Sequence, residues 1–230
     1  MKILLISGKR AGDPGDVSKI GKEADHTIEQ VEKIKPYLDK YADVTLYPTE
    51  QNAYSDVKNG ALKVKFSDYD YVLEVHFNSC VNDISGNGQT TGTEIYVTKA
   101  EATVGVETAI VKNIAALGLK NRGVKRTDFT VIKTAKNAGV SSALVEVCFI
   151  DDKDDMTIYN SKKDRIAQAI ANGIISGFKL TATTSAQTSA NTSSGKKILN
   201  ACKNESEFLS LIAPLCQSDY AKHKILPSLS

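Results

Sequence analysis

Hydrophobic residues in the first 180 positions fall into short runs separated by longer amphipathic stretches. Several of the short runs are almost continuously apolar, which is typical of strands buried on both faces of a sheet. These runs predict strands at Lys2–Ser7, Asp43–Tyr47, Tyr69–Phe77, Thr93–Thr98, Phe129–Ile132 and Ser142–Ile150.

The longer stretches between these runs repeat their apolar residues at the spacing of a helix. They predict helices at about Lys22–Lys40, Ala100–Leu117 and Lys162–Phe178, the last with Ser161 and Asp164 placed as a capping pair. Strands that alternate with helices are typical of an α/β domain with a mostly parallel sheet. We therefore expect residues 1–180 to form such a domain.

The composition changes abruptly after residue 180. Residues 181–195 read TATTSAQTSANTSSG, with no large apolar residue and no charge. Such a stretch cannot bury enough surface to offset its chain entropy, which predicts a linker over residues 181–197. Residues 198–230 begin a new apolar pattern, but they are too few for an independent core, which predicts the start of an incomplete second domain.

This division predicts how the chain responds to protease and to truncation. We expect cleavage between about Leu180 and Lys197 and a stable fragment of residues 1–180. A chain that ends at residue 180 should melt within a few degrees of the full chain, as measured by circular dichroism. A large fall in melting temperature would instead mean that residues 198–230 stabilise the first domain.

The overall charge excludes some classes of partner. The formal net charge is +2, whereas nucleic-acid-binding proteins are usually far more basic, so we expect no nucleic-acid partner. The apolar run in MKILLIS is shorter than the core of a signal peptide, and no stretch is long enough to span a membrane. These features predict synthesis in the cytoplasm without an export signal and no membrane partner.

Two polar residues inside apolar runs are candidates for chemistry. Glu146 lies among Leu144, Val145 and Val147, where a carboxylate is costly unless it is paired or bound to a cation. His76 lies toward the end of another strand, and functional groups gather at the carboxyl ends of parallel strands. One interpretation is a zinc site with His76 as ligand and Glu146 as general base. The alternative is a half-buried histidine and a glutamate that pairs with a lysine.

Five motifs together resemble the zinc-dependent N-acetylmuramoyl-L-alanine amidases of bacterial autolysins and phage endolysins. They are DPG at 13–15, KEAD at 22–25, VHFNS at 75–79, NRGVK at 121–125 and LVEVCFIDD at 144–152. The resemblance covers residues 1–180. It implies a mixed sheet of about six strands flanked by helices, and cleavage of the amide between N-acetylmuramic acid and the first L-alanine of the peptidoglycan stem peptide.

The resemblance also implies roles for individual residues. Glu23 and His76 match two of the family's three zinc ligands, and Glu146 matches its catalytic glutamate. The third zinc ligand of the family is a histidine, but Lys9 stands at its position here. A protonated lysine has no lone pair to donate, and its charge repels a cation. His26 is the nearest substitute, but the helical pattern places it on the solvent side, and His223 lies beyond the linker.

The residues after the linker resemble a second family. The segment ESEFLSLIAPLCQSDYAKHKILPSLS is similar to the opening of bacterial wall-lytic N-acetylglucosaminidase domains. The two resemblances imply a peptidoglycan hydrolase that acts on the bacterial cell wall, either a phage endolysin or a host autolysin. The alternative is a pseudoenzyme that binds the wall but is impaired because Lys9 replaces the zinc histidine.

Overall fold

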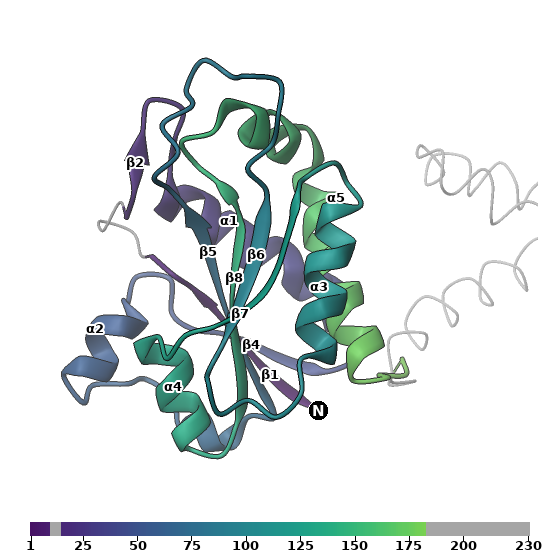
Figure 1. The fold of residues 1–230 in the computed structure, drawn as a ribbon. Coiled ribbons are helices and arrows are strands. Elements are labelled where there is room, and N and C mark those ends of the chain that lie inside the picture. Colours follow the sequence, from purple (N-terminus) through teal and green to yellow (C-terminus); the bar gives the residue numbers. More distant parts are fainter. Residues whose placement is uncertain (10–14, 183–230) are drawn as a thin grey trace, which may run out of the picture. The chain divides into compact units, whose positions relative to one another are not determined.

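A computed structural model describes residues 1–9 and 15–182, so most of the predicted linker and all of the predicted second domain lie outside it. Six strands form one sheet in the order β4-β1-β5-β8-β6-β7 (Figure 1). All neighbouring pairs are parallel except β6 and β8, which confirms a mixed, mostly parallel sheet. The strands are β1 Lys2–Ser7, β4 Asp43–Leu46, β5 Tyr71–Asn78, β6 Thr93–Val97, β7 Asn121–Arg126 and β8 Ser141–Phe149.

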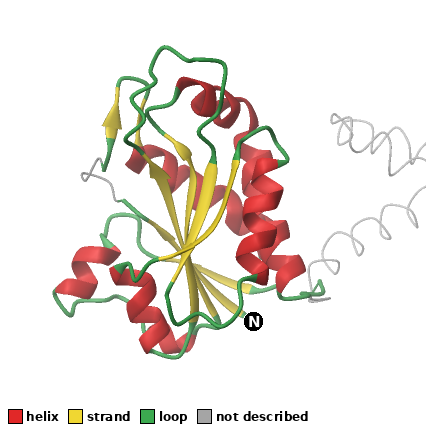
Figure 2. Ribbon diagram, in the orientation of Figure 1, coloured by secondary structure: helices red, strands yellow, loops and turns green. Residues whose placement is uncertain are grey.

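Helices cover both faces of this sheet, but to different extents (Figure 2). Three long helices, α1 Glu23–Leu38, α3 Gly105–Ala115 and α5 Lys153–Gly177, bury the larger apolar cluster on one face. Two short helices, α2 Ala53–Lys58 and α4 Thr130–Asn137, pack on a smaller cluster around Leu4 and Ile6. The remaining short elements are β2 Val17–Ser18, β3 Gly21–Lys22 and the 3₁₀ turn Phe66–Asp68. None of the described helices is long and apolar enough to cross a membrane.

The smaller cluster covers only part of its face of the sheet. Along β5, Val72 belongs to this cluster, whereas the next side chains on the same face are those of Glu74 and His76. The apolar cover therefore ends where the polar residues begin. This leaves the carboxyl-terminal half of that face for a site.

One predicted strand is wrong. The residues predicted as a strand at Phe129–Ile132 begin α4, for which Phe129 is the N-cap in an extended conformation. Val131, Ile132 and Ala135 are buried at helical spacing, and a run this short has no clear period of its own. The sixth strand is β7, whose sequence NRGVKR has almost no apolar signal.

The last helix begins earlier than predicted. It starts at Lys153, where the Asp152 carboxylate accepts hydrogen bonds from the backbone N–H groups of Asp154 and Asp155. The predicted start coincides with a kink, since Lys162 has φ −135° and ψ 20°. The predicted capping pair is not formed, because Ser161 donates to the Ile158 carbonyl and Asp164 pairs with Lys33.

A buried carboxyl in α3 predicts a pH-dependent stability. Glu107 is buried, and its pKa lies above the ordinary value of 4.5 because burial disfavours the charged form; Tyr71 donates a hydrogen bond to its Oε1. The raised pKa means that the protonated Glu107 carboxyl favours the folded state. This contribution to stability is present below pH 4.5 and is lost as pH rises through the folded-state pKa. Glu107→Gln keeps an acceptor for Tyr71 and does not titrate.

We therefore expect Glu107→Gln and the unmodified protein to have similar stabilities at pH 4. At higher pH the variant should become more stable than the unmodified protein. The difference in unfolding free energy should grow by about 1.4 kcal/mol per pH unit between the unfolded-state and folded-state pKa values of Glu107. Urea unfolding at several pH values measures the difference. A constant difference at every pH would show that Glu107 does not titrate on folding.

Candidate active site

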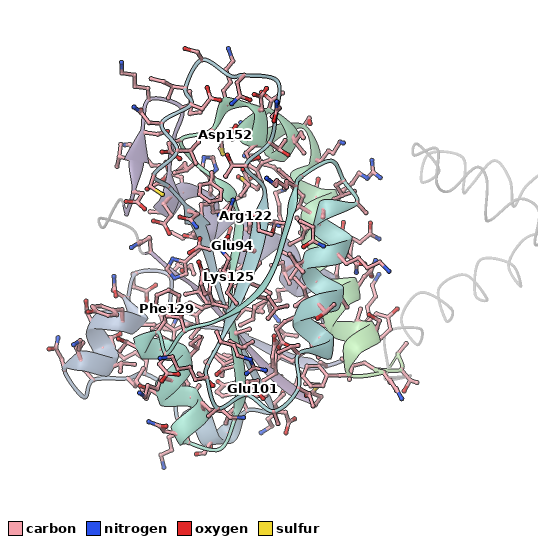
Figure 3. The ribbon with its side chains drawn as sticks, in the orientation of Figure 1. Glu94, Glu101, Arg122, Lys125, Phe129 and Asp152 are labelled. Carbon is pink, nitrogen blue, oxygen red and sulfur yellow. The ribbon has the colours of Figure 1, made fainter. Side chains whose placement is uncertain are left out.

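A row of polar side chains crosses the uncovered half of the sheet. His76 on β5 lies opposite Glu146 on β8, and Glu146 lies opposite Glu94 on β6. Residues that are direct partners on neighbouring strands point to the same face. The pairing register therefore brings these three side chains together from distant parts of the sequence, with Arg122 and Lys125 of β7 beside Glu94 (Figure 3).

His76 lies between two carboxylates. Its Nδ1 is 2.9 Å from Glu23 Oε1, and its Nε2 is 3.3 Å from Glu74 Oε1, without hydrogen-bond alignment. Glu23 begins α1, and its Oε2 accepts the backbone N–H of Asp16. Gly8 lies against the ring, since a Cβ at this position would come within 2.2 Å of His76 Nε2. The site thus needs a glycine here to seat the imidazole.

The surroundings of His76 and Glu146 shift both pKa values. Burial alone would lower the pKa of His76, but Glu23 and Glu74 raise it to about 10. Burial raises the pKa of Glu146 to about 7, and the positive charge of His76 offsets part of this effect. Glu146 Oε2 is buried without a hydrogen-bond partner. Near neutral pH this carboxyl can therefore both accept and release a proton.

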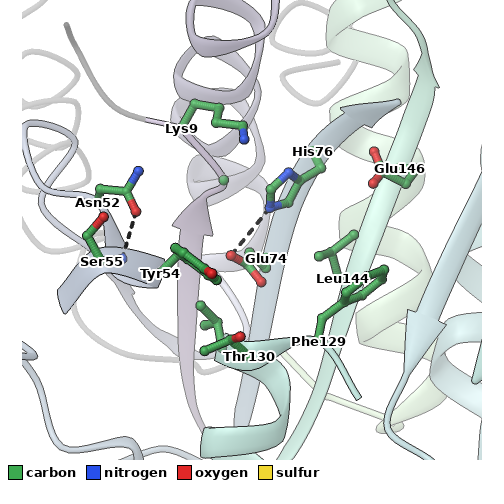
Figure 4. A pocket seen from close by; sticks show the side chains of 12 residues that line it. Lys9, Asn52, Tyr54, Ser55, Glu74, His76, Phe129, Thr130, Leu144 and Glu146 are labelled. Atoms are coloured by element: carbon green, nitrogen blue, oxygen red, sulfur yellow. Dashed lines mark hydrogen bonds and ion pairs between the residues drawn. The ribbon is translucent and has the colours of Figure 1, made fainter. Parts of the chain in front are cut away.

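Lys9 occupies the third position of the predicted metal site. Its Nζ lies 3.8 Å from Glu23 Oε2, and Figure 4 shows the side chain pointing toward His76. Glu23 Oε1 and His76 Nδ1 are close enough to hold one cation. Glu74 lies beside the other ring nitrogen, where a carboxylate can orient a histidine that binds a metal. These two donors fit a zinc ion, whereas the Lys9 ammonium does not.

The other candidates from the sequence have different roles. His26 is not on the solvent side, as the helical pattern predicted, because its ring packs 5.4 Å from Phe77 and 5.3 Å from Tyr159. It therefore lies away from the metal position. Asn78, the last residue of β5, donates a hydrogen bond from Nδ2 to Glu94 Oε1. His223 lies outside the described residues.

The polar row opens into a groove of about 450 Å³ (Figure 4). Lys9, Glu74, His76 and Glu146 line it, together with residues of the short helices α2 and α4. Tyr54 and Phe129 are exposed large apolar side chains in this lining. The sequence analysis did not predict this part of the lining, because α2 was not predicted and Phe129 was placed in a strand.

A second group of carboxylates lies elsewhere, in Asp83, Asp152 and Asp154. Each of these carboxylates accepts a hydrogen bond from at least one backbone N–H group, and Asp83 accepts from Gly86 through Oδ1, while its Oδ2 is buried without a partner. Asp152 accepts from Thr91, and Asp154 accepts from Asn87 and Gly88. This group therefore anchors the loop between β5 and β6.

Comparison with known proteins identifies the fold and the family. A family model described as N-acetylmuramoyl-L-alanine amidase matches residues 3–176. The catalytic domain of CwlV, an N-acetylmuramoyl-L-alanine amidase from Bacillus (Paenibacillus) polymyxa, superposes with a TM-score of 0.61 at 23% identity, covering 79% of this chain and 100% of that structure. This likeness shows that the fold is that of an amidase catalytic domain.

Two relatives match over most of the first domain. The endolysin of Bacillus phage SPP1 is 28% identical, and the match covers 76% of this chain and 64% of the relative. The N-acetylmuramoyl-L-alanine amidase LytC of Bacillus subtilis is also 28% identical, over 77% of this chain and 35% of the relative. The chain thus spans between about a third and two thirds of the length of these relatives.

Proposed function

Since this chain belongs to the N-acetylmuramoyl-L-alanine amidase family, we propose that its groove binds peptidoglycan and hydrolyses the amide between N-acetylmuramic acid and the first L-alanine of the stem peptide. The observation that carries this proposal is the position of Glu146. Glu146 is half-buried and lines the groove beside His76, and its Oε2 is buried without a hydrogen-bond partner. A carboxyl in that setting is suited to proton transfer to a substrate.

The proposed reaction is an attack of water on the scissile carbonyl. The Glu146 carboxylate takes a proton from the water as the new C–O bond forms. It then gives the proton to the leaving nitrogen as the C–N bond breaks, which frees the amine of L-alanine and leaves a carboxylate on the lactyl group of the sugar. A pKa of about 7 suits Glu146 to both steps near neutral pH.

We also propose that Glu23 and His76 are the protein ligands of a divalent cation, with zinc as the family's metal. Their donor atoms are 2.9 Å apart. When bound, zinc would polarise the scissile carbonyl and lower the pKa of the attacking water. Lys9 opposes this binding through its charge, and a catalytic zinc usually has three protein ligands.

The Lys9 ion pair supports a second candidate function. In this form the ammonium of Lys9 takes the place of a cation beside Glu23, and the groove binds the wall without cleaving it. The two candidates differ in products and in metal content. Elemental analysis of the dialysed protein measures the zinc content.

Product analysis on purified cell walls tests the proposed reaction. An amidase releases peptides with a new N-terminal L-alanine and no new reducing sugar end. Binding to walls without either product would favour the second candidate. New reducing ends would contradict the amidase assignment, because they arise from cleavage of the glycan.

A further inference from the structure

We propose that Arg122 and Lys125, on the edge strand β7 beyond the groove lining, bind a carboxylate of the stem peptide. This inference rests on the proposed function and deepens it, because it assigns the peptide half of the substrate to one end of the polar row. The row runs from Lys9 and His76 through Glu146 to Glu94 and these two cations.

A buried carboxylate holds both cations in place. Glu94 is only 1% exposed, and its Oε2 accepts hydrogen bonds from Arg122 Nε and Lys125 Nζ. Its Oε1 accepts from Tyr96 Oη and Asn78 Nδ2. Four donors therefore fix Glu94 as an anion, and its pKa lies below the ordinary value despite burial, because Arg122 and Lys125 favour the charged form.

Arg122 and Lys125 together carry more positive charge than Glu94 neutralises. Two positive charges face one negative charge, which leaves a net positive charge at this end of the row. The side chains of Arg122 and Lys125 are 31% and 36% exposed, so both reach solvent. Arg122 uses Nε for Glu94, and its guanidinium carries further N–H donors on the Nη atoms, suited to a carboxylate.

Aromatic rings restrict the position of each cation. Arg122 lies 5.0 Å from the ring centre of Phe149, and Lys125 lies 5.5 Å from that of Tyr96. Tyr96 in turn packs edge-on against Phe129, which lines the groove. Cations held in this way lose little conformational freedom when they bind an anion.

The distance from Glu146 suits the peptide half of the substrate. Glu146 and Glu94 are direct partners on neighbouring strands, and β7 is the next strand. Two strand spacings are about 10 Å, roughly the span of two to three extended residues. The first ionisable carboxyl beyond the alanine belongs to the next residue of the stem peptide, whereas the sugars of the glycan are uncharged there. Charge therefore selects the peptide half.

The test measures binding rather than turnover. Soluble muramoyl peptides are titrated into the Glu146→Gln protein by calorimetry, in two forms that differ only at the residue after alanine. One form carries a free α-carboxylate, and the other carries an amide at that position. We expect the acidic form to bind about tenfold more tightly at low salt, because a charge-assisted contact is lost in the amide.

Adding Arg122→Gln to this protein should remove the preference and leave binding of the amidated form within about twofold. Arg122→Lys, which keeps the charge, should retain most of the preference, and its melting curve checks the fold. Lys136→Gln is the matched control, since Lys136 pairs with another buried carboxylate, Glu101, and neither residue belongs to the polar row. It should change neither affinity.

The outcomes separate this inference from the proposed function. If both forms bind equally to the Glu146→Gln protein, or if Arg122→Gln keeps the preference, the carboxylate site is wrong and peptidoglycan binding stands. If neither form binds before Arg122 is changed, the proposed function fails, and the carboxylate site fails with it.

Discussion

Glu146→Gln should abolish amidase activity and leave the fold intact. Glutamine has almost the same shape, but it cannot take a proton from water or return one to the leaving nitrogen. Loss of a general base typically lowers the rate by about 10²–10⁴-fold. Release of N-terminal L-alanine from purified walls measures the effect, with the unmodified protein as reference.

The same substitution should not destabilise the protein. Burial raises the pKa of Glu146 to about 7, so its charged form costs stability as pH rises through that value. The glutamine variant should therefore be at least as stable as the unmodified protein at pH 8. Loss of activity together with a lower melting temperature would point to a structural role for Glu146.

Glu101→Gln is a matched control for this experiment. Glu101 is buried, and its Oε2, like that of Glu146, has no hydrogen-bond partner, but Glu101 lies outside the groove lining. This variant should keep its activity. Near-normal turnover by the Glu146 variant would exclude Glu146 as the general base.

The sequence predicted the parts of the fold whose residues are buried on both sides. Lys2–Ser7 and Ser141–Phe149 are central strands with almost continuous apolar runs, and their predicted bounds agree within one residue. The edge strand β7 has one face open, and its sequence carries mainly charge, so hydrophobic patterning did not find it. The other edge strand, β4, carries Val44 and Leu46 and was predicted, whereas β7 depends on its pairing with β6, which a local pattern does not contain.

In the site, too, some features follow from the local sequence and others depend on strand pairing. Glu146 was identified because a carboxylate among apolar residues needs a reason to be there. Glu94, between Thr93 and Ile95, satisfies the same criterion and was missed; applied to every predicted strand, this criterion would have found it. That His76, Glu146 and Glu94 form one row depends on a register between distant strands. Only the folded sheet supplies that register.

Lys9→His should convert a weak metal site into a tight one. Lys9 Nζ now lies 3.8 Å from Glu23 Oε2, where its positive charge competes with a cation. Histidine removes this charge and adds a lone pair, which brings the protein ligands to three with Glu23 and His76. Glu23 begins a helix and His76 lies on a central strand, so both are held on rigid elements.

The readouts are zinc stoichiometry after dialysis and the melting temperature with and without added zinc. A ligand at a hundred times its dissociation constant stabilises the folded state by about 2.7 kcal/mol, which is a shift of several degrees for a domain of this size. The variant should also release more L-alanine from walls than the unmodified protein. Adding Arg10→Gly should increase zinc affinity further, because glycine removes a second positive charge.

Lys9→Gln is the control that separates the two effects of the histidine. It removes the charge and adds no nitrogen donor of comparable strength, so it should bind zinc less tightly than Lys9→His. If the unmodified protein already retains one equivalent of zinc and cleaves walls, Lys9 is no obstacle, and another group completes the site. If Lys9→His with Arg10→Gly binds no zinc, Glu23 and His76 are not metal ligands, and the proposed metal site is wrong.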